Sequence, residues 1–145
     1  MAAETTTQTS KGVTLDTALH VIAAARQRAE AIGVAMNIAI VDEGNNLVAF
    51  QRMDGAWLGS MDIAKGKAYT ARAFNMSTKD LAPLCVPGQP LFGIHVSNQG
   101  QLIIFAGGIP LERGGGVVGA IGVSGGSVDQ DQEVAEAGVE AFDAD

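Results

Sequence analysis

The chain has 145 residues, of which 47% are hydrophobic and 17% charged, and its formal net charge is −7. That length suits one domain with a substantial core, and the apolar fraction excludes intrinsic disorder. The nine Lys and Arg residues are scattered, which excludes a face built to neutralise nucleic-acid phosphates. No apolar run approaches the roughly 20 residues of a membrane-spanning helix, so neither nucleic acid nor membrane is an expected partner.

Residues 1–12 are polar and rich in Thr, without the basic and apolar regions of a secretion signal. We expect them to form a flexible N-terminal arm, followed by a single domain over residues 13–145. The one cysteine, Cys85, excludes an internal disulfide and is typical of a reducing compartment, so the expected location is the cytoplasm. No histidine is adjacent to Cys85, which favours a buried or loop thiol over a nucleophile.

The first half of the chain predicts a helix, a hairpin and a second helix. Thr14 is a plausible N-cap, apolar residues then recur at helical spacing, and Gly33 ends the helix. Residues 36–42 and 47–52 are apolar and β-branched, and they predict a hairpin around the turn EGNN. The second helix, from about 60 to 75, is rich in alanine and carries a glycine, which indicates close packing against a neighbour.

The second half begins with a loop over residues 84–93, which are rich in proline and glycine. Residues 101–108 predict a strand, followed by a turn through Pro110, and residues 117–125 predict another strand. Ser127 begins the last helix as the N-cap of a capping box. Hairpins followed by helices predict an α+β fold, with helices flanking an antiparallel sheet.

Two glycine clusters are candidate ligand sites. Residues 114–119, GGGVVG, satisfy the G-x-G-x-x-G string of dinucleotide-binding proteins, but that fingerprint needs a helix to open from the glycines, and here a strand follows. The string therefore does not indicate a nucleotide site. The cluster at Ser124, Gly125 and Gly126 does lead from a strand into a helix N-terminus, where free N–H groups favour an anion. It predicts either a tight turn or an anion-binding site.

The two histidines are candidate metal ligands. His20 lies on the first helix with Asp16 four residues earlier, so Asp16 either forms a surface hydrogen bond with His20 or orients its imidazole for a metal. His95 follows the proline-rich loop and is expected to be a strand residue facing solvent. No His and Cys cluster supports a closed zinc site, whereas haem needs only one or two protein ligands. His20 is the first candidate for an axial haem ligand, and His95 is the alternative.

The second predicted helix carries Lys67 and Thr70 on one face between apolar residues. Either Lys67 extends along the helix to the surface, or it points into a pocket and binds an acid group. Arg52 and Asp54, together with the aromatic Trp57, precede this helix and are candidates for the rim of that pocket or for an oligomer contact.

The run IAIVDEGNNLVAFQRMDGAWLGSMDIAKGKAYTA, followed by PGQPLFGI, GGIPL and GAIGVSGGSVDQDQEVA, resembles the GlcG/HbpS-like family. That family includes the C-terminal domain of PduO-type adenosyltransferases, and the likeness covers about residues 13–141. It implies a profilin-like α+β fold with a five-stranded antiparallel sheet, assembly into homo-oligomers and, in some members, haem binding with haem degradation or redox sensing. The likeness does not extend to the adenosyltransferase half of PduO, so cobalamin adenosylation is not implied.

Three functions are consistent with these observations. The leading hypothesis is a cytoplasmic, oligomeric protein that binds haem or another tetrapyrrole. The alternative is a small-carboxylate-binding protein or metabolic enzyme in which Lys67, Arg52 and the turn at 124–126 hold the acid. The third is an assembly factor without catalytic activity, in which the small residues of the second helix form an interface.

Overall fold

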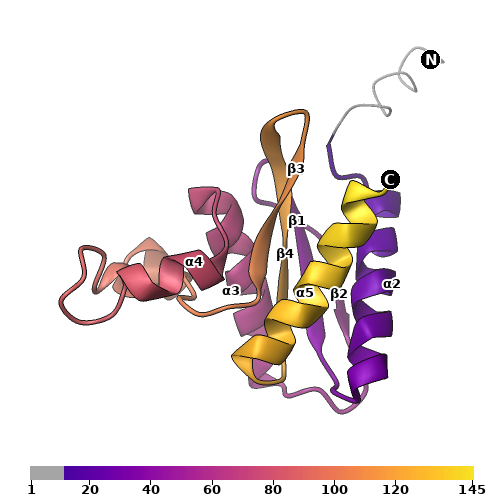
Figure 1. Cartoon of the computed structure of the whole chain (residues 1–145), viewed down its shortest axis with the longest axis horizontal. Helices are drawn as coiled ribbons and strands as arrows, with labels where there is room; N and C mark the ends of the chain where they lie inside the picture. The colour runs from indigo at the N-terminus through magenta and orange to yellow at the C-terminus, as the bar shows by residue number, and fades with distance from the viewer. Residues whose placement is uncertain (1–11) are drawn as a thin grey trace.

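The computed structural model describes residues 12–145 (Figure 1). The predicted arm, residues 1–12, lies outside the described residues apart from Gly12. The regular helices and strands in chain order are α2 (Leu15–Ile32), β1 (Asn37–Asp42), β2 (Leu47–Arg52), α3 (Gly59–Phe74), α4 (Thr78–Leu81), β3 (Gly108–Arg113), β4 (Gly116–Ser124) and α5 (Val128–Asp143). Three short 3₁₀ helices lie between α4 and β3: η1 (Ala82–Leu84), η2 (Ile94–Val96) and η3 (Asn98–Gly100).

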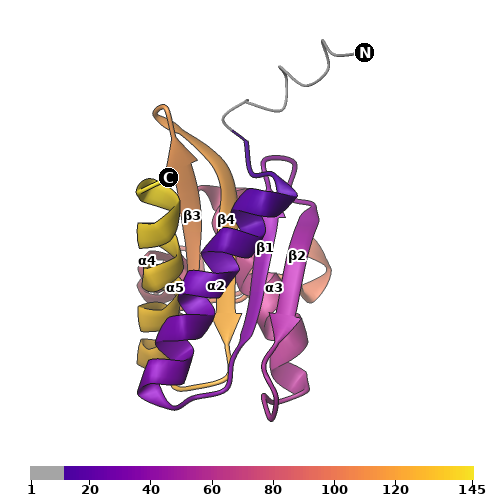
Figure 2. The same ribbon diagram turned by 90° about the vertical axis from the view of Figure 1, so that its right-hand side faces the viewer.

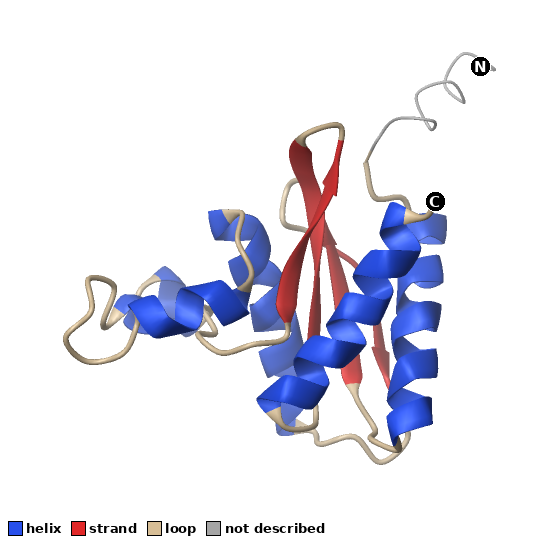
Figure 3. Cartoon of the chain, in the orientation of Figure 1, coloured by secondary structure: helices blue, strands red, loops and turns tan. Residues whose placement is uncertain are grey.

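The strands form one antiparallel sheet in the order β2-β1-β4-β3. The α+β class is confirmed, but the expected count of five strands is wrong, since the described residues contain four. The helices α2 and α5 cover one face of this sheet and α3 covers the other (Figures 2 and 3). The sheet therefore separates most side chains of α3 from those of α2 and α5, and the pair of Lys67 on α3 and Asp131 on α5 is an exception.

The core on the α2 and α5 side includes large side chains such as Ile22, Met36 and Phe142, whereas the core on the α3 side is made mainly of alanine. Ala64, Ala68 and Ala71 of α3 pack against Ala39 and Ala120 of the sheet. Side chains this small bring the helix close to the strands. The tight packing predicted for this helix is confirmed.

Local signals in the sequence place the helix ends well. The Thr14 hydroxyl accepts a hydrogen bond from the Thr17 N–H, and Gly33 ends α2 in the left-handed conformation at φ 75°. Ser127 and Gln130 form the predicted capping box at the start of α5. The hairpin of β1 and β2 and the strand β4 also lie where the sequence predicts them.

The predicted strand at 101–108 is wrong for residues 101–107, where the N–H groups of Ile103 and Gly107 bond to side chains and not to another strand. The Ile103 N–H donates to Thr70 Oγ1 at 2.9 Å, and the Gly107 N–H donates to Gln132 Oε1 at 3.1 Å. The strand β3 begins only at Gly108.

The predicted turn through Pro110 is also wrong. Pro110 lies within β3 opposite Ala120, and β3 is an edge strand of the sheet. An edge strand tolerates proline because the missing N–H has no ladder partner to lose. The chain reverses instead at Gly114 and Gly115, which have φ values of 65° and 82°.

His95 lies in η2, so its predicted place in a strand is wrong. The residues between α4 and β3 form turns and 3₁₀ helices that extend away from the sheet on the α3 side (Figure 1). Cys85 follows η1 directly; it is 2% exposed, and its Sγ donates to the Leu81 carbonyl. Burial raises the pKa of the Cys85 thiol, as expected for a cysteine that is not a nucleophile.

Candidate functional site

Lys67 and the turn at Ser124–Gly126 are brought together where α3, the end of β4 and the start of α5 meet, whereas Thr70, one turn further along α3, contacts Gly66 and Ile103. Lys67 is fully buried, and its Nζ donates to Asp131 Oδ2 at 2.8 Å and to the Val123 carbonyl at 2.9 Å. Asp131, in the first turn of α5, is 2% exposed. The interpretation that Lys67 reaches the surface is therefore wrong, and the acid group that it meets is part of the same chain.

The same carboxylate also meets the turn between β4 and α5. Asp131 Oδ1 accepts a hydrogen bond from the Gly126 N–H at 2.9 Å. The N–H groups at the start of a helix favour an anion, and here Asp131 supplies one. Gly125 has φ 152°, and a Cβ at that position would lie 2.6 Å from the Ala35 carbonyl oxygen, which accounts for glycine there.

Burial lowers the pKa of Lys67 and raises the pKa of Asp131, because each charged form loses hydration. The hydrogen bond and the attraction between the two groups oppose both shifts, and the N–H groups of Gly126 and Gly125 further favour the carboxylate. Such a pair adds little net stability, but removing one partner leaves a buried charge without compensation.

Thr70 fixes the irregular segment 102–107 against α3. Its Oγ1 donates to the Gly66 carbonyl at 2.7 Å and accepts from the Ile103 N–H. Lys67 acts on the same segment, because its Nζ lies 5.0 Å from the centroid of the Phe105 ring. In this structure Lys67 and Thr70 hold α3, α5 and the segment 102–107 together.

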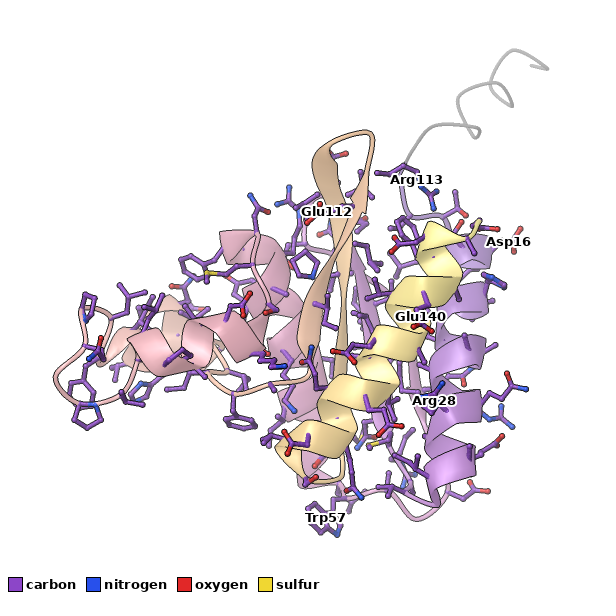
Figure 4. All side chains as sticks on the ribbon, in the orientation of Figure 1. Asp16, Arg28, Trp57, Glu112, Arg113 and Glu140 are labelled. Carbon is purple, nitrogen blue, oxygen red and sulfur yellow. The ribbon has the colours of Figure 1, made fainter. Side chains whose placement is uncertain are left out.

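Arg52 and Asp54 lie apart from Lys67. Both are exposed, and they line a hollow of about 450 Å³ beside α2, together with Arg26 and Glu30. Lys67 belongs to the opposite, α3 layer. Trp57, 68% exposed, projects from the end of the molecule opposite Glu112 and Arg113 (Figure 4).

His20 lies on the exposed side of α2, in an open hollow of about 380 Å³ whose other lining residues include Ala23, Ala24 and Gln27. Within residues 12–145, the structure records no hydrogen bond to its imidazole, so the predicted contact with Asp16 is not formed. His95 is exposed on η2, between α4 and β3.

Within the described part of the chain, no group of three or more His, Cys, Asp and Glu residues could hold a metal ion. The same residues include no helix that is long and apolar enough to cross a membrane.

A hollow of about 460 Å³, which the sequence did not predict, lies on the α3 side of the sheet, and we call it the α3 pocket. It lies between α3, the turn of the β1–β2 hairpin and the segment 100–103. Its lining includes Leu47, Ile63 and Ile103 as apolar residues and Asn45, Lys65 and Tyr69 as polar ones. Lys65 and Lys67 are two residues apart on one helix, and the sequence did not indicate which of them lines a pocket.

Comparison with known proteins supports the resemblance found in the sequence. Residues 13–140 match the family model described as haem degrading protein HbpS-like. An uncharacterized 15.0 kDa protein in the dhaT-dhaS intergenic region of Citrobacter freundii is 39% identical over 130 residues, 90% of this chain and 92% of that protein. The corrinoid adenosyltransferase PduO of the same organism is 40% identical over 119 residues, which are 82% of this chain but 36% of PduO.

Two solved structures share the fold closely. Klebsiella pneumoniae protein ORFY superposes with a TM-score of 0.91 at 39% identity, and the match covers 93% of each chain. The complex of PduOC with haem superposes with a TM-score of 0.82 at 37% identity, covering 85% of this chain and 90% of the other. The family match spans most of this chain, and the chain belongs to the HbpS-like family.

Proposed function

We propose that this protein is a cytoplasmic, oligomeric haem-binding protein and that His20 is the axial ligand of the iron. The observation that carries the proposal is the haem complex of a relative that matches 85% of the chain at 37% identity. The family description, a haem degrading protein, points to the same class of ligand.

The surface around His20 combines an exposed imidazole with small apolar residues, and the Arg26–Glu30 ion pair lines the same hollow. The imidazole is exposed and has no hydrogen-bond partner among residues 12–145, so a ring nitrogen is available to iron. Ala23 and Ala24 have small side chains that project little from α2, and Leu19, 41% exposed, adds apolar area beside them. Bound haem would supply a redox-active iron, and the protein would supply its axial ligand and its surroundings.

The same hollow is too open to enclose a ligand by itself. Small-molecule sites usually bury about 70–90% of the ligand surface, whereas the His20 hollow lies on one side of a single helix. A second copy of the chain, packed against α2, would cover the other side of the haem. The oligomer predicted from the sequence is thus part of the proposed site.

The test is a hemin titration of the intact protein, followed in the Soret band. We expect saturable binding, and we expect His20→Ala to weaken it by about tenfold or more because the iron loses its protein ligand. His95→Ala is the matched control and should bind like the wild type. Added imidazole should restore the wild-type spectrum of the His20→Ala complex, an effect that a purely structural role of His20 would not produce.

Light scattering on the same samples tests the assembly. We expect an oligomer in which hemin stabilises the contact between copies. Equal hemin affinity of the wild type and His20→Ala would refute the assignment of the ligand, and the lack of any saturable Soret change would refute haem binding itself.

A further inference from the structure

The α3 pocket is a second candidate site, on the opposite face of the sheet from His20. Its volume of about 460 Å³ lies within the range of roughly 300–1,000 Å³ that is usual for small-molecule sites. Most of its surface is apolar, and its polar lining residues are Asn45, Asp62, Lys65, Tyr69 and Gln101. We propose that the α3 pocket binds a small molecule with an apolar body and a carboxylate, and that Lys65 holds the carboxylate.

The walls of the pocket are fixed before any ligand enters. A Cβ on Gly66 would lie 2.7 Å from Ile103 Cγ1 and 2.9 Å from the Gln101 carbonyl oxygen, so the segment 101–103 lies directly on α3. Thr70 holds the same segment through the Ile103 N–H. A preformed apolar wall lowers the cost of ordering the site when a ligand binds.

Lys65 is the cation that lines this pocket, Asp62 is the acidic residue that lines it, and among residues 12–145 no buried carboxylate engages Lys65. Its Nζ lies 4.0 Å from Asp62 Oδ1, but the Asp62 side chain is 97% exposed, so their attraction is largely screened by solvent. The Nζ also lies 5.5 Å from the centroid of the Phe50 ring, which holds the ammonium near the pocket. Lys67 differs, since Asp131 already pairs with it.

The opposite side of the pocket offers a polar group without a partner. Asn45 Nδ2 donates to the Tyr69 carbonyl at 3.1 Å, whereas Asn45 Oδ1 is buried and accepts no hydrogen bond within residues 12–145. Asn45 also adopts a left-handed backbone conformation, with φ 65°. Buried acceptors without a partner are uncommon in folded proteins, and a bound water that donates both to Asn45 Oδ1 and to the ligand carboxylate would satisfy this one.

Phenylacetate and its uncharged isostere phenylacetamide are suitable probes, because they share the apolar ring and differ in the charge that Lys65 would recognise. Binding would be followed by backbone amide shifts of the full chain. We expect saturable shifts at Leu47, Lys65 and Ile103, and an affinity for the acid about fivefold higher than for the amide, because a hydrogen bond to a charged group outweighs a neutral one.

Lys65→Gln should remove the preference for the acid, whereas Lys65→Arg should keep it. Lys79→Gln, which removes the same charge from an exposed position on α4, is the control and should bind both probes like the wild type. Equal affinity of the wild type for acid and amide, no saturable shift with either probe, or shifts centred on Arg52 or His20 would overturn the proposal. Hemin binding by Lys65→Gln should be unchanged, so this test is separate from that of haem.

Discussion

At the scale of single residues, the buried pair of Lys67 and Asp131 is the most demanding feature of the molecule. The two side chains join α3 to α5, and each is the main compensation for the charge of the other. We expect Lys67→Met to lower the free energy of unfolding by about 3–5 kcal/mol at neutral pH, because it leaves a buried carboxylate unpaired. Urea unfolding followed by circular dichroism would measure the change.

A second variant separates charge from packing. Lys67→Met combined with Asp131→Asn removes both charges and keeps an oxygen to accept the Gly126 N–H, so it should recover much of the lost stability.

The loss of unfolding free energy in Lys67→Met should also become smaller as pH falls. Burial raises the pKa of Asp131, so the folded state holds the proton more tightly, and protonation favours folding below that pKa. A loss below about 1 kcal/mol in the single variant would contradict this account.

At the scale of elements, the contact between α3 and β4 depends on a glycine. A Cβ on Gly122 would collide with the Ala64 carbonyl oxygen and with the backbone N of Ala68, neither of which can move without shifting the helix. We expect Gly122→Ala to lower the free energy of unfolding by about 3 kcal/mol or more, at the upper end of overpacking effects. Gly59→Ala is the matched control, because a Cβ at Gly59 meets nothing within 4 Å. Thermal unfolding would measure both variants, and the free energy of unfolding of Gly59→Ala should lie within about 1 kcal/mol of the wild-type value.

The elements also show which parts of the fold sequence reasoning can reach. The ends of α2 and the start of α5 were predictable because their caps are local, within a few residues of the helix. The apolar segment at 101–107 was wrongly predicted to be a strand because the Ile103 N–H bonds to the Thr70 side chain, 33 residues away. No local pattern in the sequence indicates that bond. Pro110 was misassigned because whether a strand lies at the edge of a sheet depends on the whole topology.

The candidate site was reached only in part, for a related reason. Lys67 stood out in the sequence as a charge on an apolar helix face, and the structure does bury it. Its partner Asp131 is 64 residues away, so the sequence could not show that the carboxylate is internal. Lys65 could not be identified from the sequence, because the pocket that it lines forms only when α3, the hairpin turn and the segment 100–103 meet.

At the scale of the whole molecule, the sheet divides two proposed sites between two layers. The helix α2, which carries His20, lies on one face of the sheet, and α3, which lines the α3 pocket, lies on the other (Figure 2). Two sites are coupled when a structural element between them has two arrangements and each ligand favours one of these arrangements over the other. The strands between these sites are buried and paired on both sides along β1 and β4, which gives them a single arrangement.

Binding at the two sites should therefore be independent. We expect saturating phenylacetate to change the hemin dissociation constant by less than about twofold, which corresponds to a coupling free energy below about 0.4 kcal/mol. Hemin titrations with and without phenylacetate would measure this, with phenylacetamide as the control. Competition between hemin and phenylacetate, abolished in Lys65→Gln, would instead place the haem in the α3 pocket with a propionate on Lys65. A reciprocal change in both affinities without competition would mean that the sheet transmits a shift between its faces.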